Sequence, residues 1–451
     1  MDTAQWRNHI VVTLLIGAMF HLAVALLIFG EMPQTEDGPS YRAQALSILD
    51  GNQGYFFFPP GTAIAALPWY AVLGRSLTVD HLIATFFWVA FSASSAWLAW
   101  YMCSDKRAAW IASLMASFLP HSLLATGTIS SQPLTAALLA GSICIGVQAY
   151  HRGSLLRWGI ACLVLAAAVV VRPATLAITA CVGFIVIWAW FRRGLPPWTA
   201  SRALGLLIIT HVVLLLPIMK HNSDCGQGYA ISTNNEWNLL VGNNPYTPDY
   251  KTGHFGQRTF DKLPEDARTY LTRILPHQKP AFATHDERQN MRDTALRYMA
   301  DHPLRTLYRI TNRFRGFWGM DYTASRELQN TYRLSGLLTT CLLLIEGGSF
   351  VIVLLLTLFY MFAAKDRMHK PLSLIVIGAS LAPYLMAFTV AKYHTVVLPV
   401  LFPLSAMGWV WITSHQDGVR TLKKEWKKLS VIALIIVLIQ MEHIYHIVDN
   451  H

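Results

Sequence analysis

The chain has 451 residues, of which 54% are hydrophobic and 14% are charged, and its mean hydropathy is +0.38. Soluble domains carry about 25% charged residues, and the apolar residues here gather in runs of roughly 20, about the thickness of a bilayer core. These values exclude an ordinary water-soluble enzyme and indicate a polytopic membrane protein. The six cysteines form neither a disulfide framework nor a paired zinc motif.

The net charge of +11 reflects membrane orientation. Six short polar segments that we assign to the cytoplasm hold 16 basic and 5 acidic residues, and the two signs balance in the rest of the chain. Lys and Arg concentrate in short cytoplasmic loops of membrane proteins, so no nucleic-acid partner is needed. The segments are 1–9, 104–107, 151–157, 192–203, 365–370 and 414–428.

The hydropathy pattern predicts an all-α fold with about eleven transmembrane helices, a cytoplasmic N-terminus and an extracytoplasmic C-terminus. We expect an N-terminal transmembrane module (1–219), a mixed extracytoplasmic loop domain (220–333) and a C-terminal transmembrane module (334–451). The expected spans are 10–30, 80–103, 108–125, 134–150, 155–171, 174–191, 203–219, 345–364, 371–391, 395–413 and 429–447.

The first outer loop, 31–79, is too polar at its start to be membrane and too apolar later to be a plain connector. Tyr41, Ala45 and Ile48 share one helical face, which predicts a short interfacial helix that ends before Gly51. A second apolar helix is expected after the Pro59-Pro60-Gly61 run, ending near Gly74.

The second outer region, 220–333, is long enough for a small folded unit. Thr284, followed by Asp286 and Glu287, predicts a helix start. Beyond Pro303 an apolar stripe lies beside arginines that recur every four residues, which is typical of a basic amphipathic helix lying at a lipid headgroup layer. The stripe is Leu304, Leu307, Ile310, Phe314 and Phe317, and the arginines are Arg305, Arg309 and Arg313.

The acidic pair Glu36-Asp37 lies just outside the first span and allows two interpretations. A carboxylate there could take a proton from an acceptor hydroxyl or amine. Alternatively, Asp37 before Pro39 makes a good first turn and caps a helix. The two roles are compatible, and the local sequence leaves both open.

Three further segments carry candidate chemistry on the outer side. Arg172-Pro173 falls where two spans meet, a depth at which a charge is expensive and is often functional. Lys392-Tyr393-His394 occupies a tight turn that could bind a lipid-linked phosphate or be an ordinary interfacial turn. The amide-rich stretch 232–245 suits sugar hydroxyls but is also plain turn chemistry. Glu346, inside an apolar stretch, is interpreted as structural.

Together these segments resemble the GT-C glycosyltransferases that use polyprenyl-phosphate sugars, in particular the family of protein O-mannosyltransferases and bacterial lipid A aminoarabinose transferases. The chain departs from that family at Phe58, where relatives commonly have His, and at Lys392, where many have Arg. The similarity lies, in order, at Asp37-Gly38-Pro39-Ser40-Tyr41, Pro59-Pro60-Gly61, Ser131-Gln132-Pro133-Leu134, Arg172-Pro173, the Trp237-to-Pro245 segment, and Lys392-Tyr393-His394 followed by Pro399.

The resemblance implies a GT-C-like bundle with interfacial helices and an inverting sugar transfer, in which Asp37 is the general base and Glu36 its helper or alternative. It implies a polyprenyl-phosphate-sugar donor and an extracytoplasmic acceptor (a glycolipid, polysaccharide or protein), and it leaves a divalent metal open. The residues expected to bind the donor phosphate are Lys392, His394, Arg172, Arg309 and Arg313. Those expected to contact substrate are Tyr41, Trp237, Asn243, Asn244 and Tyr393.

Two other functions fit the same architecture. An O-antigen polymerase or ligase would use a lipid-diphosphate oligosaccharide and would also need a large outer loop and interfacial cations. A secondary transporter would show inverted repeats and ionisable residues at mid-membrane, and the sequence shows no repeat. The outer loops contain no Asn-X-Ser/Thr sequon, which favours a bacterial inner membrane over an endoplasmic one.

Overall fold

The computed structural model describes residues 3–250, 262–363 and 369–414, apart from 104, 194–196 and 277–278, together with several residues between 423 and 440. The described part consists of helices and short 3₁₀ turns and contains no strand. Eight described helices are long and apolar enough to cross a membrane, and three shorter ones are also apolar. The protein is therefore an all-α integral membrane protein.

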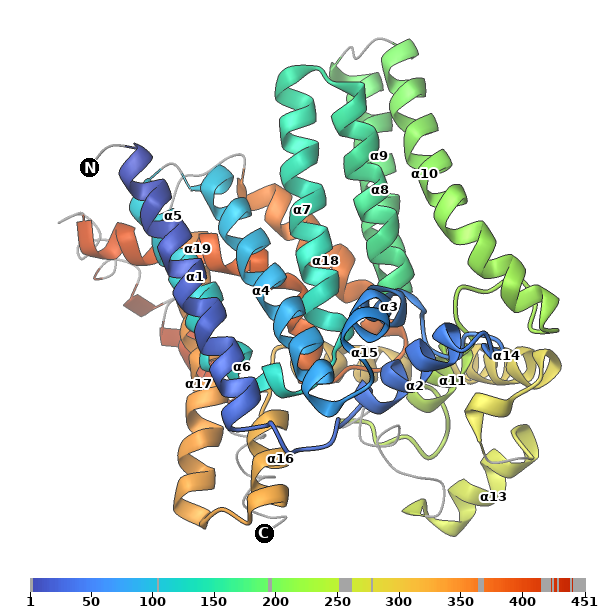
Figure 1. The fold of residues 1–451 in the computed structure, drawn as a ribbon. Helices are drawn as coiled ribbons and strands as arrows, with labels where there is room; N and C mark the ends of the chain where they lie inside the picture. Colours follow the sequence, from blue (N-terminus) through green and yellow to red (C-terminus); the bar gives the residue numbers. More distant parts are fainter. Residues whose placement is uncertain are drawn as a thin grey trace.

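Ten of the eleven expected spans coincide with helices of the bundle (Figure 1). The eleventh, 429–447, lies largely outside the described residues. The bundle helices are α1 (Thr3–Leu27), α4 (Leu77–Met102), α5 (Lys106–Phe118), α7 (Ser131–Arg152), α8 (Leu155–Val171), α9 (Leu176–Arg193), α10 (Pro197–Asp224), α17 (Gly336–Ala363), α18 (His369–Met386) and α19 (Leu398–Ser414).

Three span boundaries differ from the expectation. The span expected at 108–125 breaks before Pro120 into α5 and α6 (Pro120–Leu124). Proline favours a break here because it has no backbone N–H to donate and its ring clashes with the carbonyl of the preceding turn. Helix α17 begins about three turns earlier than predicted, so Glu346 lies inside it. Helix α18 ends at Met386 rather than at 391, and the chain then forms the 3₁₀ turn η5 (Ala391–Val397).

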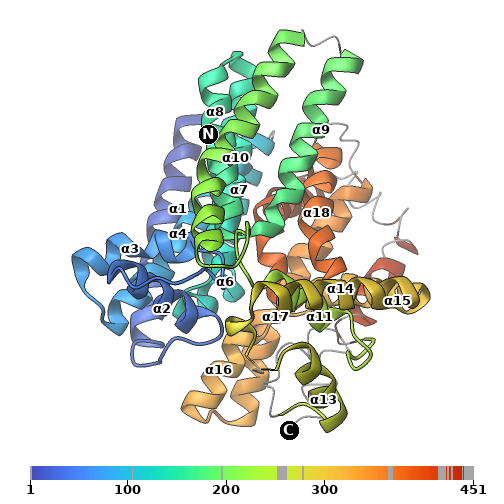
Figure 2. The ribbon, with the colours of Figure 1, turned by 90° about the vertical axis from the view of Figure 1, so that its right-hand side faces the viewer.

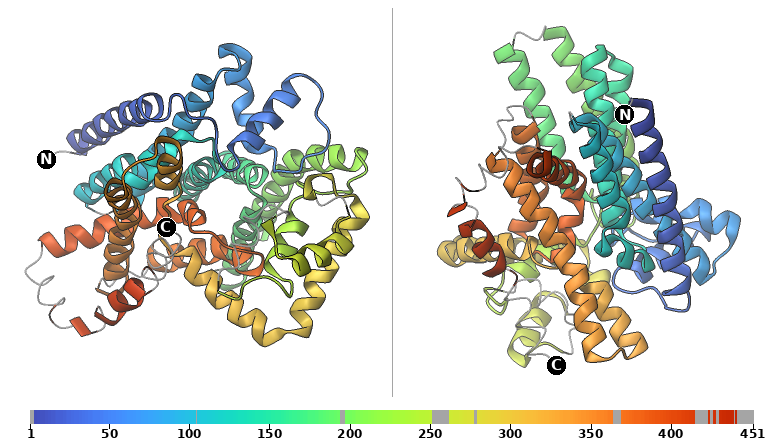
Figure 3. Two further views of the ribbon diagram at one scale, coloured as in Figure 1. Left: turned by 90° about the horizontal axis from the view of Figure 1, so that it is seen from below. Right: turned by 90° about the vertical axis from the view of Figure 1, so that its left-hand side faces the viewer.

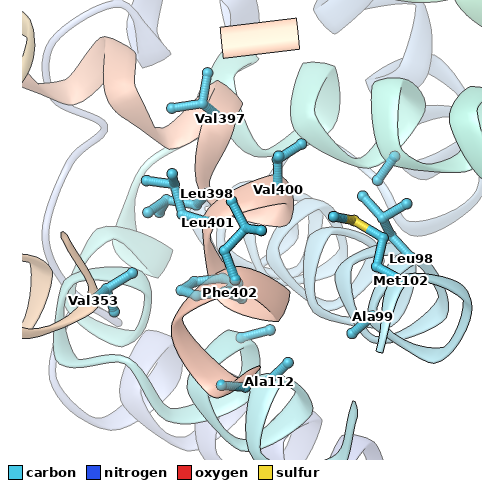
Figure 4. Close-up of a cluster of buried hydrophobic side chains, with 14 of the residues drawn as sticks. Leu98, Ala99, Met102, Ala112, Val353, Val397, Leu398, Val400, Leu401 and Phe402 are labelled. Atoms are coloured by element: carbon cyan, nitrogen blue, oxygen red, sulfur yellow. The ribbon is translucent and has the colours of Figure 1, made fainter. Parts of the chain in front are cut away.

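The core of the bundle is built around α19, most of which is buried, whereas α9 and α10 are largely exposed. Figure 4 shows α19 side chains such as Leu401 and Phe402 packed against α4, α5 and α17. Small residues, for example Ala99 and Ala112, let these helices approach closely, as is usual where lipid provides no hydrophobic driving force between helices. The buried α19 fixes the adjacent turn η5 relative to the rest of the bundle.

The non-spanning elements gather at the lower end of the bundle in Figure 1, opposite the N-terminus. Seen from below in Figure 3, α2 and α3 border one side of this end and α14 and α15 another. These elements are α2 (Gly38–Leu49), α3 (Gly61–Leu73), η1 (Ala125–Gly127), η2 (Pro173–Thr175), α11 (Asn235–Gly242), α13 (Glu265–Ile274), η4 (Pro280–Phe282), α14 (His285–Asp301), α15 (Pro303–Phe317) and α16 (Thr323–Tyr332).

The predicted starts and ends of three helices in the two outer regions are confirmed. Helix α2 ends before Gly51 and buries Tyr41 and Ala45, and α3 runs from Gly61 to Leu73. Helix α14 begins with a capping box, in which the Thr284 side chain accepts from the Glu287 amide and the Glu287 carboxylate accepts from the Thr284 amide. The described part of the loop domain, expected to be mixed, consists of helices joined by turns and irregular segments.

Helix α15 is amphipathic, as predicted, but two of its three arginines lie inside the protein. Leu304, Leu307 and Phe314 are exposed, whereas Arg309 and Arg313 are 0% and 1% exposed. These two arginines are inside because backbone carbonyls of neighbouring segments need donors, and a guanidinium group offers five. Figure 2 shows α14 and α15 running across the end of the bundle, below α9 and α18. The exposed face of α15 is therefore largely apolar, and Arg305 is its exposed arginine.

Candidate active site

The acidic pair and the basic turn meet at the end of the bundle opposite the N-terminus. The Lys392 ammonium lies 3.2 Å from a Glu36 carboxylate oxygen and 3.5 Å from an Asp37 carboxylate oxygen. Asp37 and Lys392 are 355 residues apart in the chain. Two carboxylates and one cation thus form a compact cluster between the start of α2 and the turn η5.

The backbone at Glu36 is unusual. Its φ angle is +52°, in the left-handed region that non-glycine residues rarely occupy. The adjacent loop is held in place by Gln34, whose side-chain amide donates to the Gly127 carbonyl and accepts from the Ile129 amide. Strained backbone that its surroundings hold in place is often found at functional sites.

The structure separates the two interpretations of Asp37. Its backbone occupies the N-cap position of α2, but its side chain makes no capping hydrogen bond. The carboxylate points to Lys392 instead and is 41% exposed, so an incoming acceptor can reach it. Asp37 thus begins the helix through its backbone and keeps its side chain for the site.

Glu36 lies deeper than Asp37, with 28% of its side chain exposed. Burial raises the pKa of the Glu36 carboxyl above its ordinary value, against the opposing charge of Lys392, and Asp321 and Asp37 raise it further. Glu36 therefore holds a proton more readily than an ordinary exposed glutamate does.

Arg172 stands close to this cluster at the carboxyl end of α8. Its guanidinium lies 4.5 Å from the centre of the Tyr393 ring and 5.5 Å from that of Tyr384, in cation–π contact with both. One of its nitrogens donates to the Ser131 hydroxyl at 3.2 Å. The tyrosines and Ser131 thus orient a cation at the outer end of the spans.

A pocket extends from the cluster into the bundle. Its lining includes Glu36 and Lys392 together with Gln132, His121, Asp321 and Glu346. The His121 Nδ1 atom is buried without a hydrogen-bond partner, 3.9 Å from an oxygen of Asp321 and 3.9 Å from an oxygen of Glu346. The pocket wall is therefore rich in carboxylates.

Other predicted site residues have different surroundings. Tyr41 is 4% exposed and packs edge-on against Phe58, 5.7 Å between ring centres. His394 is fully buried, stacked on Phe350 at 3.7 Å, and its Nδ1 atom donates to the Phe317 carbonyl. Phe58, one of the departures from the family pattern, thus has a packing role beside Tyr41.

The remaining predicted residues belong to the loop domain and not to the cluster. Arg309 donates to Asp249 and to the carbonyls of Asn244 and Thr247. Arg313 donates to four acceptors described below. Asn243 and Asn244 are fully buried and bond to backbone carbonyls, and Trp237 packs on the apolar core of the loop domain. The structure therefore does not bring these residues together with Lys392.

Three residues near the cluster were missed by sequence reasoning: His121, Asp321 and Tyr384. His121 belongs to none of the motifs that carry the resemblance, and Tyr384 lies inside the expected span 371–391. Asp321 is the last acidic residue before α16. Its expected position on the outer side was the one feature of the sequence that could have pointed to the site. Glu346, interpreted as structural, does accept from the backbone and side chain of Ser325, but it also lines the pocket.

Within the described residues, no group of three or more His, Cys, Asp or Glu side chains is arranged to hold a metal ion. Glu36 and Asp37 both contact Lys392.

No protein-family model matches the chain, and no curated protein matches it. Among solved structures, it is similar to the archaeal oligosaccharyltransferase AglB from Archaeoglobus fulgidus in complex with an inhibitory peptide and a dolichol-phosphate. The TM-score is 0.52 at 13% identity, covering 97% of this chain and 55% of AglB. The chain thus spans about half the length of AglB.

A second similar structure is ArnT from Cupriavidus metallidurans bound to undecaprenyl phosphate. The TM-score is 0.40 at 12% identity, covering 91% of this chain and 78% of ArnT. At such identities a structural likeness concerns the fold, and the AglB match extends over nearly all of this chain. Over nearly all of its length, the chain therefore has the fold of the AglB oligosaccharyltransferase.

Proposed function

We propose that the protein is an inverting glycosyltransferase that moves a sugar from a polyprenyl-phosphate donor to an acceptor on the extracytoplasmic face of a membrane. The absence of Asn-X-Ser/Thr sequons in the outer loops favours a bacterial inner membrane. The observation that carries this proposal is the meeting of Glu36, Asp37 and Lys392 at the outer end of the bundle. An apolar donor can reach this place from the bilayer and a polar acceptor from outside.

Asp37 is the proposed general base, because its carboxylate is the more exposed of the two. It would take the proton of an acceptor hydroxyl or amine as the acceptor atom bonds to the anomeric carbon. The bond from that carbon to the phosphate oxygen breaks at the same time, and the phosphate leaves with the electron pair. Attack opposite the leaving phosphate inverts the configuration.

Lys392 and Arg172 are the proposed partners of the leaving phosphate. Cations placed where negative charge develops stabilise a transition state, and both side chains lie at the outer end of the spans. Before the donor binds, Lys392 pairs with the two carboxylates. An entering phosphate would draw the ammonium away from Asp37, and the freed carboxylate could then accept a proton.

The test is transfer of labelled sugar from synthetic polyprenyl-phosphate donors by full-length protein in nanodiscs, with a membrane extract as the source of acceptor. We expect D37N to lower turnover about 10²- to 10⁴-fold, the usual contribution of a general base. D50N is the matched control, because Asp50 is exposed at the other end of α2 and pairs with Arg75. Its turnover should equal that of the wild type.

Three other outcomes would change the proposal in different ways. Turnover that survives in D37N but is lost in E36Q would move the base to Glu36. Release of polyprenyl diphosphate from an oligosaccharide donor, with no turnover of any monosaccharide donor, would make the protein a polymerase or ligase. Uptake of a solute without any lipid product would support the transporter.

A further inference from the structure

Helix α15 holds both ends of the segment that presents Lys392. This segment, 385–394, runs from the end of α18 into the turn η5. At its start, one Arg313 nitrogen donates to the carbonyl oxygens of Leu385 at 2.7 Å and Met386 at 3.0 Å. At its end, His394 Nδ1 donates to the carbonyl of Phe317, the last residue of α15, at 3.2 Å.

The loop domain is joined to the same point. A second Arg313 nitrogen donates to the Gly242 carbonyl at 2.5 Å and to the Asn243 side-chain oxygen at 3.0 Å. The Asn243 amide donates in turn to the Met386 carbonyl at 2.9 Å. A Cβ atom at Gly242 would overlap the carbonyl of Ala387, so the two backbones touch. Arg313 is thus the centre of a junction between α11, α15 and the end of α18.

Only arginine suits this position. The last carbonyls of a helix have no partner within the helix, and those of Leu385 and Met386 face Arg313 and Asn243 of the loop domain. A planar guanidinium with a fixed fork of donors can bond to four oxygens at once, whereas a lysine ammonium is a single point. Arg313 is 1% exposed, so it does not reach the solvent or a lipid phosphate directly.

We propose that Arg313, together with Asn243, is a positioning residue for Lys392. This inference rests on the function proposed above. Arg313 and the Phe317 carbonyl fix the two ends of segment 385–394, and the short turn between them carries the ammonium to within 3.5 Å of Glu36 and Asp37. A displacement of about 1 Å at a reacting centre can cost about 10²-fold in rate, so a fixed turn matters.

The test is a double-mutant cycle between Arg313 and Lys392, measured as kcat/KM for sugar transfer from a polyprenyl-phosphate donor. We expect K392M to lower kcat/KM about 10²- to 10³-fold, as loss of a transition-state donor does, and R313Q about 10- to 100-fold. If Arg313 acts through Lys392, the double variant is no slower than K392M alone. R313K, which keeps the charge but lacks the fork, should resemble R313Q.

R288Q is the matched control for loss of a buried arginine. Arg288 is 3% exposed, and its hydrogen bonds go to Gln227, Glu236 and His285 within the loop domain. We expect R288Q to lower the Tm while kcat/KM stays within about twofold of the wild-type value, because the substitution changes the loop domain and not the site. If R313Q does not fold, N243A replaces it in the cycle, since it removes one bond to Met386 and one to Arg313.

The outcomes of the cycle are distinguishable. Losses that multiply in the double variant would overturn the inference, because Arg313 would then act independently of Lys392. Wild-type activity in R313Q or N243A would overturn it as well. Wild-type activity in K392M would instead contradict the phosphate role of Lys392 in the proposed function.

Discussion

The sequence predicted where Asp37 lies but not what its carboxylate does. Its position before Pro39 correctly predicted the first turn of α2, and the backbone does cap that helix. Whether the carboxylate caps or reacts depends on what faces it, and what faces it is Lys392, 355 residues away. A local pattern contains no information about such a neighbour.

At the same scale, the pH dependence of folding should report the burial of Glu36. Its folded pKa is raised above the ordinary 4.5, so the folded state holds the proton more tightly than the unfolded state does. The contribution of Glu36 to stability is therefore complete below about pH 4.5 and falls as the pH rises through the folded pKa. We expect the Tm of the wild type minus that of E36Q to decrease over this range.

This difference is measured by thermal unfolding in detergent at several pH values. E31Q is the control, because Glu31 is an exposed carboxylate just outside the first span. A difference that grows with pH would mean that the ion pair with Lys392 outweighs burial.

At the scale of elements, the Pro59-Pro60-Gly61 motif has a packing explanation. Gly61 is the first residue of α3, and a Cβ atom there would lie 2.5 Å from the Val171 nitrogen and 2.7 Å from the Val170 carbonyl carbon. The glycine lets α3 touch the backbone at the end of α8, one residue before Arg172. The motif therefore connects the first outer loop to the region of the site.

We expect G61A to destabilise the protein by about 1–3 kcal/mol, because backbone atoms cannot move aside as a flexible side chain could. The measurement is chemical or thermal unfolding in detergent. G54A is the matched control in the same loop, since a Cβ at Gly54 would meet nothing within 4 Å. Equal stability of the two variants would show that α3 can shift without cost.

Helix α15 shows what the periodicity of a sequence can and cannot predict. The 3.6-residue pattern predicted its range, but not which face would be buried. A stripe of arginines on a helix suits a lipid surface as well as a set of buried carbonyls, and only the tertiary structure supplies the carbonyls of Gly242, Leu385 and Met386. Arg309 and Arg313 were expected to bind the donor phosphate, but their side chains lie inside the loop domain.

At the scale of the whole molecule, hydropathy and charge predicted the arrangement well. Ten expected spans coincide with helices, and the candidate motifs of the outer side lie at one end of the bundle (Figure 1). Hydropathy and charge both reflect how each segment interacts with the bilayer, and that interaction does not depend on where the segment lies in the chain. The pocket behind the cluster was not predicted, because His121, Asp321 and Glu346 converge only through helix packing.

The orientation of the whole chain is testable through its own thiols. Cys225 follows α10 at the outer end and is exposed. In a C341S background, we expect a membrane-impermeant maleimide to label Cys225 on intact cells. H151C, at an exposed position in the last turn of α7, should be labelled only after the membrane is permeabilised. The opposite pattern would place the carboxylate–lysine cluster in the cytoplasm.

The cluster also has a consequence for how the protein is made. Translation adds about 5–20 residues per second, and Asp37 precedes Lys392 by 355 residues. Roughly 20–70 s therefore pass at the ribosome between synthesis of the acid and synthesis of its cation. During that interval the N-terminal spans can already be in the bilayer with both carboxylates unpaired. A nascent chain stalled anywhere in the loop domain would then expose two acids at the membrane surface and have no means of binding a lipid phosphate through Lys392.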